Sequence, residues 1–238
     1  MRDKRVIIPT LFNAQSLRQA SDPFALIEKL LNGSMFMSSP SQLFFLPGAS
    51  GNTHFWRPVA HQLHHKAKPI FFSWPGFGET PPDPSITRLA DLTTLLLAQL
   101  TKPTALIAQS MGGIIAIQAA LQRPDLITHL VLTATSGGVD MTQFGAQDWR
   151  PGFVAQHPNL PQWFLQDKSN HSAQLTEIKQ PVLLLWGDAD PISPVAVGQY
   201  LAEALPNAHL RVFTKAKHDV GFTHAAQIAP LIDQHLEK

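Results

Sequence analysis

The sequence predicts an α/β protein with a doubly wound, mostly parallel β-sheet. Short apolar runs alternate with helix-like segments from residue 42 to the end of the chain, and this alternation is typical of parallel sheets. The runs are nearly continuous, without polar alternation, as expected of strands covered on both faces. Charged residues are only 15% of the chain, against about 25% in a typical domain, which fits the same architecture.

Six apolar runs are expected to form the strands, each buried on both faces. Pro69, Pro103 and Pro181 stand at or just before three of them, where a missing N–H is least harmful. The predicted strands are residues 42–46, 69–73, 104–108, 126–133, 181–186 and 210–214.

Helical patterns lie between these runs. A further short helix is expected at 24–31, with Asp22 as N-cap, Pro23 in the first turn and Asn32-Gly33 as its end. The other predicted helices are residues 55–65, 86–100, 111–122, 194–204 and 225–235.

Two segments do not follow this alternation of predicted strands and helices. Residues 1–41 are expected to form an N-terminal extension; either Met35 or Met37 is the natural start and the leader is peripheral, or its helix packs on the domain. Residues 137–176 contain Gly and Pro but no strand pattern, and a loop of that length inside a domain is usually functional. We therefore expect a cap insertion at 137–176 over a core made of 42–136 and 177–238.

Composition excludes several classes of protein. Net charge is +1, which gives no electrostatic footprint for nucleic acid. The chain has no cysteine, which excludes disulfides, thiolate nucleophiles and cysteine-ligated metals. No apolar run approaches the ~20 residues of a membrane span, and the start of the chain is a poor signal peptide. A cytoplasmic protein is expected.

The densest chemical signal surrounds Ser110. A buried strand leads directly into Ser110, and Met111, Gly112 and Gly113 then open an apolar helix. A serine on a sharp strand-to-helix turn needs small neighbours, and the helix N-terminus offers N–H groups to an oxyanion. The alternative is an ordinary turn in which Ser110 caps the helix.

The segment Ala108-Gln-Ser110-Met-Gly112 resembles the nucleophile elbow of the α/β-hydrolase superfamily, G-x-S-x-G, with alanine for the first glycine. Residues 44–52 resemble the family's oxyanion loop, with Pro47 where histidine is usual. The resemblance implies an oxyanion hole made of the backbone N–H groups of Met111 and Ala49, with Ser50 as the next candidate for the second donor. Residues 72–80 resemble a scaffold turn of the family. The matches cover about 42–136 and 177–236.

The resemblance also implies a catalytic triad in the order Ser, acid, His. Ser110, Asp190 and His218 follow that order, each after a predicted strand. Asp190 is preferred to Asp188, because Gly-x-x-Asp-Pro is the family's usual form and Asp188 suits a turn. Asp140, after the fourth strand, is the remaining candidate for the acid.

The other histidines have simpler explanations. His61, His64 and His65 are spaced like metal ligands, but a solvated helix face explains them better, and no metal site is predicted. His54 follows the oxyanion loop and is assigned to a surface loop, although it could lie near the substrate.

A serine nucleophile argues against the superfamily's haloalkane dehalogenases and epoxide hydrolases, which use aspartate. The resemblance implies a serine hydrolase that cleaves an ester or related acyl bond of a small, largely apolar substrate through an acyl-enzyme, with water as the second reactant and no cofactor. Alternatives are a carbon–carbon bond hydrolase, a thioesterase or lactonase, and a ligand-binding protein without catalysis.

Specificity is expected to come from the insertion. Its aromatic side chains could form an apolar lid over an acyl pocket, or they could only anchor the insertion to the sheet. Arg150 could hold one carboxylate. The candidates for the pocket are Phe144, Trp149, Phe153 and Trp163.

Overall fold

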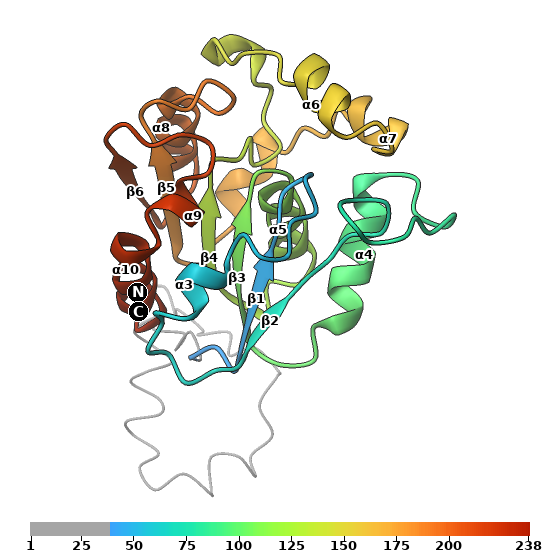
Figure 1. The fold of residues 1–238 in the computed structure, drawn as a ribbon. Coiled ribbons are helices and arrows are strands. Elements are labelled where there is room, and N and C mark those ends of the chain that lie inside the picture. Colours follow the sequence, from blue (N-terminus) through green and yellow to red (C-terminus); the bar gives the residue numbers. More distant parts are fainter. Residues whose placement is uncertain (1–38) are drawn as a thin grey trace, which may run out of the picture. The chain divides into compact units, whose positions relative to one another are not determined.

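A computed structural model of the protein describes residues 39–238. Six parallel strands form one sheet in the order β2-β1-β3-β4-β5-β6, and helices cover both of its faces (Figure 1). The predicted fold class is therefore confirmed. The helix expected at 24–31 and the alternative starts at Met35 and Met37 lie outside the described residues.

Four of the six strands are buried on both faces as predicted, and two are not. The inner strands β1, β3, β4 and β5 are almost wholly buried, whereas β2 is half-buried and β6 is largely exposed. Both exceptions are edge strands, which have a neighbour on one side only. The strands are β1 (Gln42–Leu46), β2 (Pro69–Phe71), β3 (Thr104–Gln109), β4 (Ile127–Thr133), β5 (Val182–Gly187) and β6 (Ala208–Phe213).

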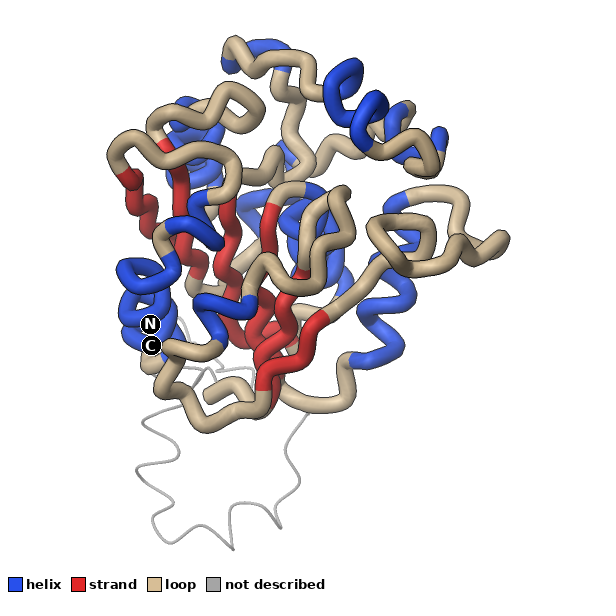
Figure 2. The backbone as a smooth tube through the Cα atoms, in the orientation of Figure 1, coloured by secondary structure: helices blue, strands red, loops and turns tan. Residues whose placement is uncertain are grey.

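The helices follow the predicted order, with one clear difference in length. The helix expected at 55–65 ends at Ala60, because the Asp233 carboxylate accepts the backbone N–H groups of His64 and His65 at 2.9–3.1 Å and turns the chain away. Figure 2 shows the helices on either side of the strands. They are α3 (Arg57–Ala60), α4 (Leu89–Gln99), α5 (Met111–Gln122), α8 (Val195–Ala204), α9 (Val220–Thr223) and α10 (Ala225–Leu236).

Alternate residues of each inner strand face two separate hydrophobic cores. In β1, Phe44 and Leu46 pack with the core that includes α4, α5 and α8, whereas Leu43 and Phe45 pack with α3, α9 and α10. Covering both faces of the sheet in this way leaves few positions for charged side chains, which accounts for the low charge of the sequence.

The strand order places two chain turns side by side. After β1 the chain forms β2 on one side of β1, at the edge of the sheet. It then crosses back, and β3 pairs with β1 on the opposite side. Leu46, the last residue of β1, is opposite Ala108. Parallel α/β sheets bind ligands at the carboxyl ends of strands where the order reverses in this way. The loops after β1 and β3 therefore mark the expected site.

Residues 137–176 contain four short helices and no strand. Figure 1 shows α6 and α7 beyond the carboxyl ends of the strands. Within residues 39–238, no helix combines the length and the apolar character that crossing a bilayer requires. The four elements are η1 (Thr142–Phe144), α6 (Arg150–Gln156), α7 (Gln162–Leu165) and η2 (Ser172–Glu177), the last of which ends at residue 177.

Candidate active site

Ser110 occupies a sharp turn between β3 and α5, with φ 52° and ψ −120°. A positive φ is uncommon for a residue other than glycine and is typical of a strained functional turn. The turn requires small neighbours: a Cβ on Gly112 would lie 2.7 Å from the carbonyl oxygen of Pro47, and one on Gly113 would lie 2.5 Å from Thr135 Oγ1. Ala108, the departure from the glycine pattern, is fully buried, so its single methyl group fits.

The Ser110 side chain does not cap the helix. It makes no cap hydrogen bond, and its Oγ lies 3.1 Å from Nε2 of His218. The capping alternative is therefore wrong, and the hydroxyl instead faces a base within hydrogen-bond distance.

His218 also contacts Asp190, so that the three side chains form one chain of hydrogen bonds. Asp190 Oδ2 lies 2.8 Å from His218 Nδ1. The Asp190 side chain has no exposed surface, and that of His218 is 23% exposed. A buried carboxylate beside Nδ1 favours the tautomer that carries its proton on Nδ1, and Nε2 then presents a lone pair to the Ser110 hydroxyl.

The remaining oxygen of Asp190 is also satisfied. Oδ1 accepts the backbone N–H groups of Ile192 at 2.8 Å and Ser193 at 3.1 Å. These bonds hold the carboxylate in place.

The two other candidate carboxylates serve turns. Asp188 Oδ1 accepts the backbone N–H of Lys215, a residue with φ 59° in the loop that leads to His218. Asp140 is exposed, and its Oδ1 accepts the N–H and the hydroxyl of Thr142. The Thr142 N–H lowers the pKa of Asp140. Asp190 is the carboxylate that contacts His218.

The loop after β1 lies directly against the nucleophile turn. A Cβ on Gly48 would lie 3.1 Å from the Ser110 Cβ. Among the described residues no protein acceptor takes the backbone N–H of Ala49, and the N–H of Met111 at the start of α5 has none either. N–H groups without a protein acceptor on turns beside a serine are of the kind that can stabilise an oxyanion.

The turn at 72–80 supports this loop, as expected of a scaffold. Trp74 Nε1 donates to the carbonyl oxygen of Pro47 at 2.9 Å. Gly51 and Gly78 both have positive φ and approach so closely that a Cβ on Gly51 would lie 2.5 Å from the Gly78 nitrogen. The contact leaves no space for any side chain at either position.

Thr135 also contacts the nucleophile turn, and the sequence analysis did not identify it. Its Oγ1 donates to the carbonyl oxygen of Ser110 at 2.6 Å and accepts the N–H of Gly137 at 3.1 Å. Thr135 lies two residues after β4, the buried strand that pairs with the strand before Ser110.

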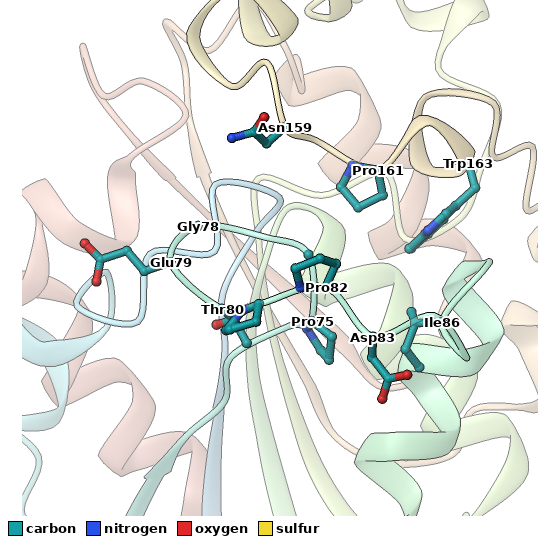
Figure 3. A pocket seen from close by; sticks show the side chains of 12 residues that line it. Pro75, Gly78, Glu79, Thr80, Pro82, Asp83, Ile86, Asn159, Pro161 and Trp163 are labelled. Atoms are coloured by element: carbon teal, nitrogen blue, oxygen red, sulfur yellow. The ribbon is translucent and has the colours of Figure 1, made fainter.

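A cavity of about 510 Å³ lies between the turn after β2 and the insertion. Figure 3 shows Pro161 and Trp163 facing Pro75 and Pro82 across it. Ser110 does not line it; the nearest link is Gly78, which lines the cavity and packs on Gly51. The lining residues are Pro75, Gly76, Gly78, Glu79, Thr80, Pro81, Pro82, Asp83, Ile86, Asn159, Pro161 and Trp163.

Of the four aromatic candidates for the pocket, Trp163 is the one that lines this cavity. Trp149 packs on Phe153 and on Phe164, with ring centroids 5.4 and 5.5 Å apart. Phe144 packs on Tyr200. These three side chains anchor the insertion internally or to α8.

The histidines spaced like metal ligands do not form a metal site. His61, His64 and His65 follow the end of α3 and are not on a helix face, and His64 Nδ1 contacts Asp233 at 3.1 Å. No group of three potential ligands suited to a metal occurs in residues 39–238. His54 is exposed, in the loop after Gly51.

Comparison with known proteins assigns the chain to a protein family. A family model described as alpha/beta hydrolase fold matches residues 42–176, more than half of the chain. Pimeloyl-[acyl-carrier protein] methyl ester esterase of Chromobacterium violaceum is 27% identical, over 75% of this chain and 87% of that protein. A 2-hydroxy-6-oxononadienedioate/2-hydroxy-6-oxononatrienedioate hydrolase of Burkholderia vietnamiensis is 24% identical, over 81% and 84%.

Solved structures agree on the fold. MenH from S. aureus superposes with a TM-score of 0.68 at 20% identity, covering 83% of this chain and 94% of its own. The meta-cleavage product hydrolase CumD of Pseudomonas fluorescens gives a TM-score of 0.68 at 16% identity, covering 82% and 90%. The chain thus belongs to the α/β-hydrolase fold family and is an enzyme of the α/β-hydrolase type.

Proposed function

We propose that this protein is a serine hydrolase that cleaves a carboxylic ester, or a related acyl bond, of a small and largely apolar substrate. The hydrogen-bonded chain Ser110–His218–Asp190, with distances of 3.1 and 2.8 Å, carries the proposal. It combines a nucleophile, a base and an orienting acid at the carboxyl ends of β3, β5 and β6.

In the first half-reaction His218 Nε2 takes the Ser110 hydroxyl proton as Oγ attacks the carbonyl carbon. The N–H groups of Met111 and Ala49 stabilise the oxyanion that forms. When the tetrahedral intermediate collapses, the bond to the leaving oxygen breaks, and His218 gives its proton to that oxygen. An alcohol departs, and the acyl group remains on Ser110.

In the second half-reaction water attacks the acyl-enzyme. His218 takes a proton from the water and returns it to Ser110 Oγ as the acyl bond breaks. The acid is released, and Asp190 stabilises the imidazolium in both halves. In both half-reactions His218 is the side chain that accepts and returns the transferred proton.

Residues 137–176 are proposed as the cap of this site, with 42–136 and 177–238 as the core. The cavity under the insertion has walls of proline, Ile86 and Trp163, and its only charged lining residues are Glu79 and Asp83. Arg150 is paired with Asp148 at 3.2 Å and donates to the Leu165 carbonyl. These contacts support a substrate whose acyl group is uncharged.

A carbon–carbon bond hydrolase is the second candidate. The relative from Burkholderia vietnamiensis is named for a dienedioate substrate, which carries two carboxylates. A cavity with two acidic and no basic lining residues suits such a dianion poorly. Comparing a p-nitrophenyl ester with a diketone that carries two carboxylates distinguishes the two activities, and we expect faster turnover of the ester.

Covalent labelling tests the nucleophile. A fluorophosphonate probe is expected to add once to the protein, on the peptide that contains Ser110, since its Oγ faces a histidine that is itself held by a buried carboxylate. Intact-mass spectrometry followed by peptide mapping measures the adduct, with Ser110→Ala as the comparison variant. Equal labelling of the variant, or no adduct on the native protein, rejects the proposal.

We propose that the acyl chain extends from Ser110 into the cavity under the insertion, so that Trp163, which lines the cavity, contacts it. Trp163→Ala should raise KM for p-nitrophenyl octanoate about tenfold, because an apolar wall of the cavity is lost, and should change KM for the acetate ester less than twofold. Phe153→Ala, which removes an aromatic ring that does not line the cavity, is the comparison. The assignment fails if both variants change KM for the octanoate equally.

A further inference from the structure

We infer that His171 is a positioning residue. Its contact with Gln118 attaches the C-terminal part of the insertion (residues 171–176, here called its root) to α5, the helix that begins after Ser110. The inference rests on the proposed function, since the insertion affects turnover only if it covers the substrate. His171 lies near the end of the insertion, directly before η2, and Gln118 lies two turns into α5.

The contact joins three elements through buried polar groups. Gln118 Nε2 lies 3.1 Å from His171 Nε2. On its other side, Gln118 Oε1 accepts the hydroxyl of Thr93 in α4 at 2.5 Å. Thr93 is fully buried and Gln118 is 7% exposed. Removing the imidazole would therefore leave the amide nitrogen of the buried Gln118 without its partner, which costs more than an ordinary hydrogen bond.

His171 also connects the two ends of the insertion through its backbone. The His171 backbone N–H donates to the carbonyl oxygen of Gly138 at 2.7 Å. Gly138 has φ 81°, and a Cβ there would lie 2.4 Å from the His171 ring. The start of the insertion thus passes directly under the imidazole, which only glycine allows.

Hydrogen bonds continue from this point to the nucleophile. Thr135 Oγ1 donates to the Ser110 carbonyl and accepts the Gly137 N–H, one residue before Gly138. The second route runs along α5 from Ser110 to Gln118. His171 is thus connected to Ser110 both through Thr135 and through α5. The contact between His171 and Gln118 therefore fixes the position of the insertion relative to the Ser110 hydroxyl.

Kinetics with short and long esters test the role of His171. His171→Ala is expected to raise KM for p-nitrophenyl octanoate about tenfold, equivalent to one buried hydrogen bond. We expect kcat, and KM for the acetate, to stay within about twofold of the native enzyme. His157→Ala is the matched control, because His157 is also a half-buried histidine of the insertion but stacks only on Phe153. His171→Gln, whose amide can still bond Gln118, should recover most of the loss.

Limited proteolysis gives a second readout that does not need turnover. Lys168, which precedes Ser169, is an exposed trypsin site in the insertion, whereas Arg150 precedes Pro151 and is not cut. If His171 holds the root, His171→Ala should be cut there about tenfold faster than the native protein or the His157→Ala variant, since cleavage follows the population of the open form. Gln118→Ala should match His171→Ala, and the double variant should be no worse than either.

Two results would overturn the inference. One is that His171→Ala and His157→Ala give the same KM and the same cleavage rates. The other is that His171→Ala lowers kcat equally for both esters while the whole protein loses stability. If the native protein neither hydrolyses esters nor accepts the fluorophosphonate, the proposed function fails, and the cleavage rates still decide whether His171 holds the insertion.

Discussion

Replacing Asp190 by Asn should lower kcat for ester hydrolysis about 10⁴-fold, as loss of the orienting acid does in serine hydrolases with this geometry. Oδ1 of the asparagine can still accept the N–H groups of Ile192 and Ser193. The new NH₂ group, however, faces His218 Nδ1, at the position where Oδ2 now lies 2.8 Å away. The imidazole must then present a lone pair on Nδ1 and a proton on Nε2, so it cannot take the proton of Ser110.

Asp188→Asn is the matched control, because Asp188 is two residues away and its carboxylate holds the turn at Lys215. Its amide oxygen can accept the same N–H, so kcat should stay within about threefold of the native value. Steady-state kinetics with p-nitrophenyl butyrate, together with thermal unfolding of both variants, separate lost chemistry from lost fold. Similar losses in both variants would show that Asp190 has no special role.

The second large effect concerns stability in acid. His129 in β4 and His235 in α10 are both about 2% exposed or less, with ring centroids 5.3 Å apart. In the described part of the chain neither ring nitrogen of His129 has a hydrogen-bond partner, and His235 Nε2 bonds the carbonyl oxygen of Leu130 at 3.0 Å. Two neutral imidazoles therefore lie against each other in the core between the sheet and α10.

Burial lowers the pKa of His129, and separately that of His235, from 6.5 to about 4. Well above pH 6.5 both histidines are neutral in the folded and the unfolded chain, so they add no pH dependence there. Below pH 6.5 the unfolded chain binds protons that the folded chain does not, and the free energy of unfolding falls until about pH 4. At pH 5 the loss is about 2 kcal/mol for each histidine.

Urea unfolding at pH 7.5 and pH 5.0 measures this loss. His129→Leu should unfold with a smaller drop between the two pH values, by about 2 kcal/mol. It should also be about 1–3 kcal/mol more stable at pH 7.5, because two ring nitrogens without partners are removed. His61→Leu, at an exposed position, is the control and should leave the drop unchanged. A drop in His129→Leu as large as that of the native protein contradicts this account.

The elements that the sequence identified are those whose signals are local. Ser110 stands between a buried strand and a helix, and the small residues at 112 and 113 are needed because neighbouring loops approach within 3 Å of where a Cβ would be. Asp190 and His218 were assigned from the triad order and the Gly-x-x-Asp-Pro form that the family resemblance implies, and each follows a predicted parallel strand whose carboxyl end lies at the same edge of the sheet. No distance had to be known for that inference.

The parts that were missed depend on neighbours far along the chain. α3 ends early because Asp233, about 170 residues later, takes the N–H groups of His64 and His65. The exposure of β6 follows from its place at the sheet edge, which a run of apolar residues does not reveal. Likewise, Gln118 is a single polar residue on the buried side of an apolar helix, and its partner His171 becomes visible only when the insertion is folded.

The strand order has a mechanical consequence. Ser110 follows β3 and His218 follows β6, with β4 and β5 between them. Three strand spacings of about 4.8 Å put the ends of these strands some 14 Å apart, and each step adds a rotation of about 20–25°. The loop through Lys215 spans that offset and brings the imidazole back over the sheet to within 3.1 Å of the hydroxyl. The distance between the two groups therefore depends on the spacing and twist of all the strands from β3 to β6, as well as on the loop itself.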